Sequence, residues 1–188
     1  MARIKLIQET EASGDSQHLL QKIEANGARV LNLYRAVAVS PGPASSFLKL
    51  GNLLRNRVEL SPILREIAIL RIAKLTGSVY EWTQHVQIAL EEGVRQSQID
   101  DVERWKDSDQ FNDEERAVLQ YTDEVSVDVK VKDSTFAEVR QYLDERSIVE
   151  LTVSIGYWGM IARVLVPLEV DLDEKSVGSA GELFGKGK

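Results

Sequence analysis

Two consecutive sets of helix start and stop signals in the middle of the chain constrain the fold most. Ser61 and Pro62 mark a helix start, because serine accepts hydrogen bonds from free backbone amides and proline suits the first helical position. Apolar residues then cover most of the helical circumference over residues 63–75, so this helix should be central. Gly77 ends it, and a second amphipathic helix is expected over residues 78–92. The two segments together predict a hairpin of antiparallel helices.

The spacing of apolar residues predicts which side of the second hairpin helix is buried. Trp82, Val86, Ala89 and Leu90 recur at helical intervals. We therefore expect these four side chains to face the core.

The most apolar stretch of the chain lies near its C-terminal end. Ser147 and Glu150 form the pattern of a capping box, which predicts a helix start there and a helix over residues 148–164. Glu150 and Arg163 interrupt the apolar run, so we expect a buried helix rather than a membrane span.

Helix punctuation recurs along the rest of the chain, whereas the alternation typical of strands does not. The prediction is a single all-α domain over residues 1–173, followed by a flexible tail over 174–188, where glycine, serine and lysine are frequent. The remaining helices are expected at about residues 15–26, 28–39, 44–57, 97–105, 114–127 and 133–143.

Composition narrows the classes of partner and of chemistry. The 188 residues carry a formal net charge of −7, which gives no electrostatic basis for binding nucleic acid or an anionic membrane surface. The N-terminal residues lack an apolar signal core, so we expect a cytoplasmic protein. The chain contains no cysteine, which excludes disulfides, thiolate metal sites and thiol redox chemistry.

Two histidines are the candidates for acid–base chemistry near neutral pH. His18 lies in a short polar helix and is expected to be exposed. His85 lies four residues after Glu81, so both side chains share one helix face. Glu66 is a carboxylate within the very apolar first hairpin helix, and an antiparallel hairpin would bring it near His85. If Glu81 also lies beside Glu66, one of the two carboxyl groups must have a raised pKa, bind a cation or pair with charged His85.

The hairpin carries a specific set of motifs, with looser agreement over residues 28–165. They are Arg65-Glu66-Ile67-Ala68-Ile69-Leu70-Arg71, Thr76-Gly77-Ser78, Glu81-Trp82-Thr83-Gln84-His85, Ala89-Leu90 and Gly93. In these motifs the chain resembles the carboxymuconolactone decarboxylase and alkylhydroperoxidase D superfamily.

The resemblance implies an alkylhydroperoxidase D-like helical fold and assembly as a homotrimer or homohexamer. Ser78 and Glu81 stand where the peroxidase branch of the superfamily has its pair of cysteines. A thiol peroxidase cycle is therefore excluded, and the chain is similar to the decarboxylase-type branch that lacks these cysteines. That branch implies loss of CO2, without a cofactor or metal, from a small carboxylated lactone or related oxo acid.

The resemblance also implies roles for the matched residues. His85 would be the proton donor, Glu66 would set its tautomer and pKa, and Glu81 would be a second acid or a hydrogen-bonding partner. Substrate contacts are expected from Arg71, Arg35, Tyr80 and Ser78.

Two other interpretations remain open at this point. The chain could be a non-catalytic oligomeric scaffold that keeps the polar pair for structural reasons. It could instead bind a metal ion or a small ligand, with Glu66, Glu81 and His85 as the ligating side chains.

Overall fold

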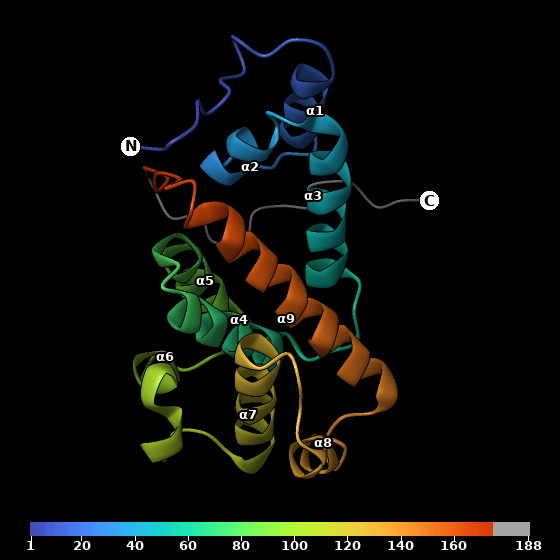
Figure 1. Cartoon of the computed structure of the whole chain (residues 1–188), viewed down its shortest axis with the longest axis vertical. Helices are drawn as coiled ribbons and strands as arrows, with labels where there is room; N and C mark the ends of the chain where they lie inside the picture. Colours follow the sequence, from blue (N-terminus) through green and yellow to red (C-terminus); the bar gives the residue numbers. More distant parts are fainter. Residues whose placement is uncertain (175–188) are drawn as a thin grey trace.

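The computed structural model describes residues 1–174, and within this range the chain forms helices and no strands (Figure 1). The predicted all-α class is confirmed. All but the first residue of the predicted tail lies outside the described residues. The helices are α1 (Gly14–Ala25), α2 (Asn32–Val37), α3 (Pro41–Asn56), α4 (Pro62–Thr76), α5 (Val79–Glu92), α6 (Gln96–Asp101), the 3-10 helix η1 (Val102–Asp107), α7 (Asp113–Val127), α8 (Asp133–Val139) and α9 (Glu145–Leu165).

Helix α4 is the centre of the fold, because it packs against α5, α7 and α9. Nine of its side chains are buried, including those of Arg65 and Glu66. Gly77 adopts a left-handed conformation with φ of 67°, which a residue with a Cβ adopts only at a cost, and it turns the chain directly into α5. The predicted helix hairpin is therefore present, and it holds the polar residues of α4 against the start of α5.

Helix α9 crosses the molecule diagonally in Figure 1 and lies across α3 and the hairpin. Its length and hydropathy would allow it to cross a membrane, but 56% of its most apolar window is buried against other parts of the chain. Core helices of water-soluble proteins pass the same test. This burial agrees with the prediction of a packed helix rather than a span.

The start of α9 differs from the predicted capping box. Asp144 caps the helix, since its Oδ1 accepts a hydrogen bond from the backbone N–H of Ser147 at 2.7 Å. Glu150 instead accepts hydrogen bonds from the backbone N–H groups of Glu59 and Leu60, both at 2.8 Å. The carboxylate thus ties the loop before α4 to α9, a long-range contact that local spacing does not reveal.

Two helix boundaries near the N-terminus were also predicted incorrectly. The helix expected over residues 28–39 is limited to α2, and the next helix begins at Pro41 rather than at residue 44. Proline has a fixed φ and no N–H, so it can begin a helix as readily as it ends the preceding one.

The buried face of α5 is more polar than predicted. Glu81, Gln84, His85, Ile88 and Ala89 are buried, whereas Trp82 and Val86 are half-buried and Leu90 is 38% exposed. The spacing of the apolar residues therefore predicted the wrong side of α5 as its buried face. The reason is that α5 presents polar side chains to an internal cavity, described below.

Gly51 allows a close approach of α9 to α3. A Cβ at this position would lie 2.6 Å from Cζ of Tyr157, whose rigid aromatic ring is buried. We predict that Gly51→Ala lowers the free energy of unfolding by about 1–3 kcal/mol through overpacking. Thermal or denaturant unfolding measures the change. The matched control is Gly42→Ala in the same helix, where nothing lies within 4 Å, and it should not destabilise the protein. Equal effects of the two substitutions would contradict this packing.

Candidate active site

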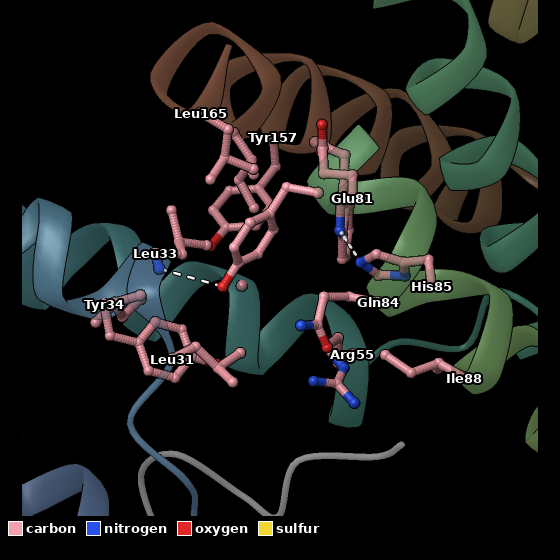
Figure 2. A pocket seen from close by; sticks show the side chains of 15 residues that line it. Leu31, Leu33, Tyr34, Arg55, Glu81, Gln84, His85, Ile88, Tyr157 and Leu165 are labelled. Atoms are coloured by element: carbon pink, nitrogen blue, oxygen red, sulfur yellow. Dashed lines mark hydrogen bonds between the residues drawn. The ribbon is translucent and has the colours of Figure 1, made fainter. Parts of the chain in front are cut away.

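A small cavity lies where α5 and α9 meet α2 and α3, and its volume is about 80 Å³. Figure 2 shows Glu81, Gln84 and His85 of α5 on one side of it, with Tyr157 and Leu165 of α9 nearby and Tyr34 of α2 across from them. Most of the other lining side chains are apolar. They are Leu31, Leu33, Leu48, Ile88 and Ile161.

A hydrogen-bond network lies behind the wall of the cavity and reaches it through His85 and Trp158. Glu66 is fully buried, with 0% exposure, and its two carboxylate oxygens have different partners. Oε2 is 2.7 Å from Nδ1 of His85, and Oε1 accepts a hydrogen bond from Nε of Arg65 at 3.2 Å. The predicted proximity of Glu66 and His85 is therefore present in the structure.

Trp158 of α9 completes this network and fixes the tautomer of His85. Its indole Nε1–H can only donate, and it donates to Nε2 of His85 at 3.0 Å. Nε2 must therefore lack a proton, so Nδ1 carries the proton and donates it to Glu66. In this arrangement His85 is a neutral ring with both nitrogens occupied and has no proton directed at the cavity. The geometry therefore differs from the expectation that His85 is the proton donor.

The charge of Glu66 is stabilised by its neighbours. Burial alone would raise the pKa of Glu66, but the hydrogen bond that it accepts from His85 and the positive charges of Arg65 and Arg55 lower it. The net result is a pKa below the ordinary value of glutamate. Glu66 is therefore ionised at neutral pH.

Glu81 has the opposite environment. Its side chain is 2% exposed, and neither carboxylate oxygen has a hydrogen-bond partner within residues 1–174 by distance and angle. Burial raises the pKa of Glu81 to about 8, and the nearby Ser78 hydroxyl offsets only part of this effect. At neutral pH most molecules therefore carry a protonated, neutral Glu81. The anticipated conflict between two carboxyl groups is resolved by one ionised and one protonated group.

Three tyrosines and one arginine supply the remaining polar groups of the cavity. Burial raises the pKa values of Tyr34, Tyr80 and Tyr157, that of Tyr34 to about 12, so all three hydroxyls stay protonated. Arg55 of α3 lies close enough to oppose these shifts at Tyr34 and Tyr157. Its guanidinium forms no ion pair with any residue of the described range.

Two of the residues expected to contact substrate lie away from this cavity. Nε of Arg71 pairs with Asp123 of α7 at 2.5 Å, and Arg35 pairs with Glu9 at 2.6 Å. Neither arginine lines the cavity, because each is held by an acidic partner elsewhere. Both are ion pairs that tie segments together.

The other two residues expected to contact substrate, Tyr80 and Ser78, differ in their position relative to the cavity. Tyr80 does line the cavity, and its hydroxyl accepts a hydrogen bond from the backbone N–H of Leu33 at 3.2 Å, drawn as a dashed line in Figure 2. Ser78 does not line it; it is buried beside Glu81 and borders a separate hollow near the end of α9. Ser78 can thus act only through Glu81.

Sequence reasoning missed Arg55, and for Tyr34, Tyr157 and Trp158 it favoured a place in the core or in a subunit interface over a place in the pocket. A signal for Arg55 exists in its spacing, since it follows Gly51 by four residues and so shares the face of α3 that meets α9. The role of Trp158 depends on the packing of α9 on α5, a contact between segments 73 residues apart.

Within the described part of the chain, no three histidine, aspartate or glutamate side chains are arranged to hold a metal ion. The interpretation of Glu66, Glu81 and His85 as a ligand set therefore has no geometric support. Glu66 and His85 already use their polar atoms on Arg65, Trp158 and each other.

Removal of the Glu66 carboxylate, which lies at the centre of the buried network, should strongly lower the stability of the protein. Glu66→Ala leaves Arg65, which is 2% exposed, and His85 without their partner, so we expect the free energy of unfolding to fall by about 3–5 kcal/mol. Glu92→Ala is the matched control, because Glu92 also approaches Arg65, at 3.7 Å, but is 37% exposed. This control should cost less than about 1 kcal/mol. Denaturant titration measures both, and equal losses would show that the Glu66 network is not critical.

Comparisons with known proteins agree with this geometry. The sequence pattern of the carboxymuconolactone decarboxylase family matches residues 41–124, which include both hairpin helices. The uncharacterized protein YdfG of Bacillus subtilis is 24% identical over 103 residues, which are 52% of this chain and 70% of YdfG.

Solved structures share the fold at low sequence identity. An uncharacterized peroxidase-related protein of Ralstonia eutropha with an alkylhydroperoxidase AhpD core superposes with a TM-score of 0.78 at 15% identity, over 92% of this chain and 93% of that one. The debrominase Bmp8 in complex with 2,3,4-tribromopyrrole has a TM-score of 0.72 at 19% identity, over 93% and 95% of the two chains. Residues 41–124 thus match the carboxymuconolactone decarboxylase family, and the chain has the helical fold of the AhpD-like structures.

Proposed function

We propose that this protein is a cofactor-independent lyase that removes CO2 from a small carboxylated lactone or related oxo acid, with Glu81 as the general acid. The observation that carries the proposal is the environment of Glu81. It is a buried carboxyl group at the wall of a cavity, without a hydrogen-bond partner in residues 1–174, and its pKa is raised to about 8. Such a group holds a proton at neutral pH and can deliver it to a bound molecule.

The reaction needs a proton donor next to the substrate carbon that loses CO2. When the bond between the substrate carbon and its carboxylate breaks, CO2 leaves and the electron pair stays on the carbon as a conjugated enolate. Glu81 then transfers its proton to that carbon, and the resulting carboxylate regains a proton from solvent. Arg55 and the tyrosine hydroxyls stabilise the negative charge that develops on the enolate oxygen.

The hydrogen-bond network around His85 has a positioning role in this scheme. His85 and Trp158 are locked together through Nε2, and Glu66 holds the other ring nitrogen. These contacts fix α5 relative to α4 and α9 and therefore fix the position of Glu81. His85 thus acts as a positioning residue, and Glu81 takes the role of proton donor that was expected of His85.

The fold supports a small ring as the ligand. Bmp8, which shares this fold, binds 2,3,4-tribromopyrrole, a small planar ring. Most of the residues that line the cavity of the present chain are apolar or aromatic, and such residues surround a ring of this kind favourably. The peroxidase-related name of other structural neighbours does not extend to this chain, because a chain without cysteine cannot run a thiol cycle.

The test is turnover of a panel of small carboxylated lactones and oxo acids, followed by ultraviolet absorbance. Glu81→Gln keeps the size of the side chain but removes the transferable proton, so we expect the rate to fall by about 10²–10⁴-fold. Glu92→Gln makes the same charge change at the exposed end of α5 and should keep the rate within about twofold of the original. No turnover of any panel member by the unaltered protein, or an unchanged rate in Glu81→Gln, would contradict the proposal.

The pH dependence gives an independent check on the acid. Because the protonated form of Glu81 is active, the rate should be high below about pH 8 and fall about tenfold per pH unit above it. Ser78 lowers the pKa of Glu81, so Ser78→Ala should move this limb to higher pH. A rate that rises with pH through this range would show that Glu81 is not the acid.

A further inference from the structure

A carboxylate of the chain itself is bound at the edge of the cavity. The hydroxyl of Tyr80 donates a hydrogen bond to Oδ2 of Asp173, and Nε2 of Gln84 donates to the same oxygen at 3.1 Å. The backbone N–H of Asn32 donates to Oδ1 at 2.9 Å. Both oxygens of Asp173 are thus held by donors from three positions.

Two of these donors belong to the wall of the cavity. Tyr80 and Gln84 lie four residues apart on α5, on either side of Glu81, and both line the cavity. A carboxylate held by this pair therefore lies near the acid of the proposed reaction. Arg55 lines the same cavity and adds positive charge there.

Within the described residues, polar contacts hold the segment 171–173 that carries Asp173. Nδ2 of Asn32 donates to the carbonyl oxygens of Asp171 and Leu172 at 3.1 and 3.2 Å, and the side chain of Asp171 accepts from Ala2. Leu172 is 48% exposed, and the last side chain of the chain that is buried in the core of the described residues is that of Val170, before this segment. A segment with few buried apolar contacts opens at low cost compared with the helices.

The size of the cavity also favours displacement of this segment. Its volume of about 80 Å³ is smaller than the cavities of about 150 Å³ known to admit a benzene ring. A ring-sized substrate therefore needs additional space. Release of Asp173 would open the side of the cavity at which Tyr80 and Gln84 lie.

We propose that Tyr80, Gln84 and the backbone N–H of Asn32 form a carboxylate-binding subsite, which Asp173 occupies as an internal competitor. A substrate binds by replacing the carboxylate of Asp173 with its own and thereby gains access to Glu81. This inference rests on the proposed function for the identity of the ligand as a small carboxylate, but it concerns binding alone.

The test uses acetate as the probe and the full-length protein. Acetate is added in steps, and binding is followed by NMR through the side-chain amide of Gln84 and the indole N–H of Trp158, with chloride at equal ionic strength as the reference. Asp173→Ala empties the subsite, so we expect its Kd for acetate to be at least about tenfold lower than that of the unaltered protein. Asp171→Ala removes a charge two residues away that contacts Ala2 instead, and it should leave the Kd within about twofold.

A second substitution shows where acetate binds. Gln84→Leu, added to Asp173→Ala, should raise the Kd for acetate again by about tenfold or more, because it removes a donor to the carboxylate. Equal Kd values for Asp173→Ala and the unaltered protein would overturn the inference, as would equal effects of Asp173→Ala and Asp171→Ala. Glu81→Gln separates the two proposals, since it should slow turnover by about 10²–10⁴-fold and leave acetate binding to Asp173→Ala unchanged.

Discussion

The buried carboxylate of Glu66 is the interaction on which the site depends. Glu66 lies in the central helix α4 with no exposure to solvent, and an ionised group there is tolerated only because Arg65 and His85 pair with it. Trp158 extends the network to α9 through His85. One buried charge thereby connects three helices and determines how α5 faces the cavity.

In this arrangement two different residues hold the helices in place and carry the transferable proton, although a single Glu/His pair could do both. His85 accepts from Trp158 and donates to Glu66, so its ring serves to position the surrounding helices. Glu81 lies on the same helix one turn earlier but has no such partner, and burial keeps it protonated. The difference between the two carboxyl groups arises from their surroundings, since both are buried glutamates. Pairs of titratable groups with divergent pKa values are typical of acid–base sites.

The sequence predicts the helix hairpin well, because its start and stop signals at Pro62, Gly77 and Gly93 are local and unambiguous. It also predicts the pairing of Glu66 and His85, since the hairpin turn leaves little choice of register. It does not predict Arg55 as the cavity arginine, the role of Trp158 or the contact of Glu150 with the loop before α4, because each depends on how distant helices pack. The buried face of α5 was misjudged because polar residues there face a cavity that a hydrophobic pattern cannot show.

The protonation of Glu81 at neutral pH is the central claim, and it can be measured directly. Glutamate labelled with ¹³C at the side-chain carboxyl carbon allows each carboxyl group to be followed by NMR from acidic to alkaline pH, and the signal missing in Glu81→Gln identifies Glu81. We predict that this one signal titrates near pH 8, whereas the signal of Glu66 titrates below the ordinary pKa of a glutamate. Titration of Glu81 near its ordinary value, at about pH 4.3, would contradict the account, because Glu81 would then have no proton to transfer at neutral pH.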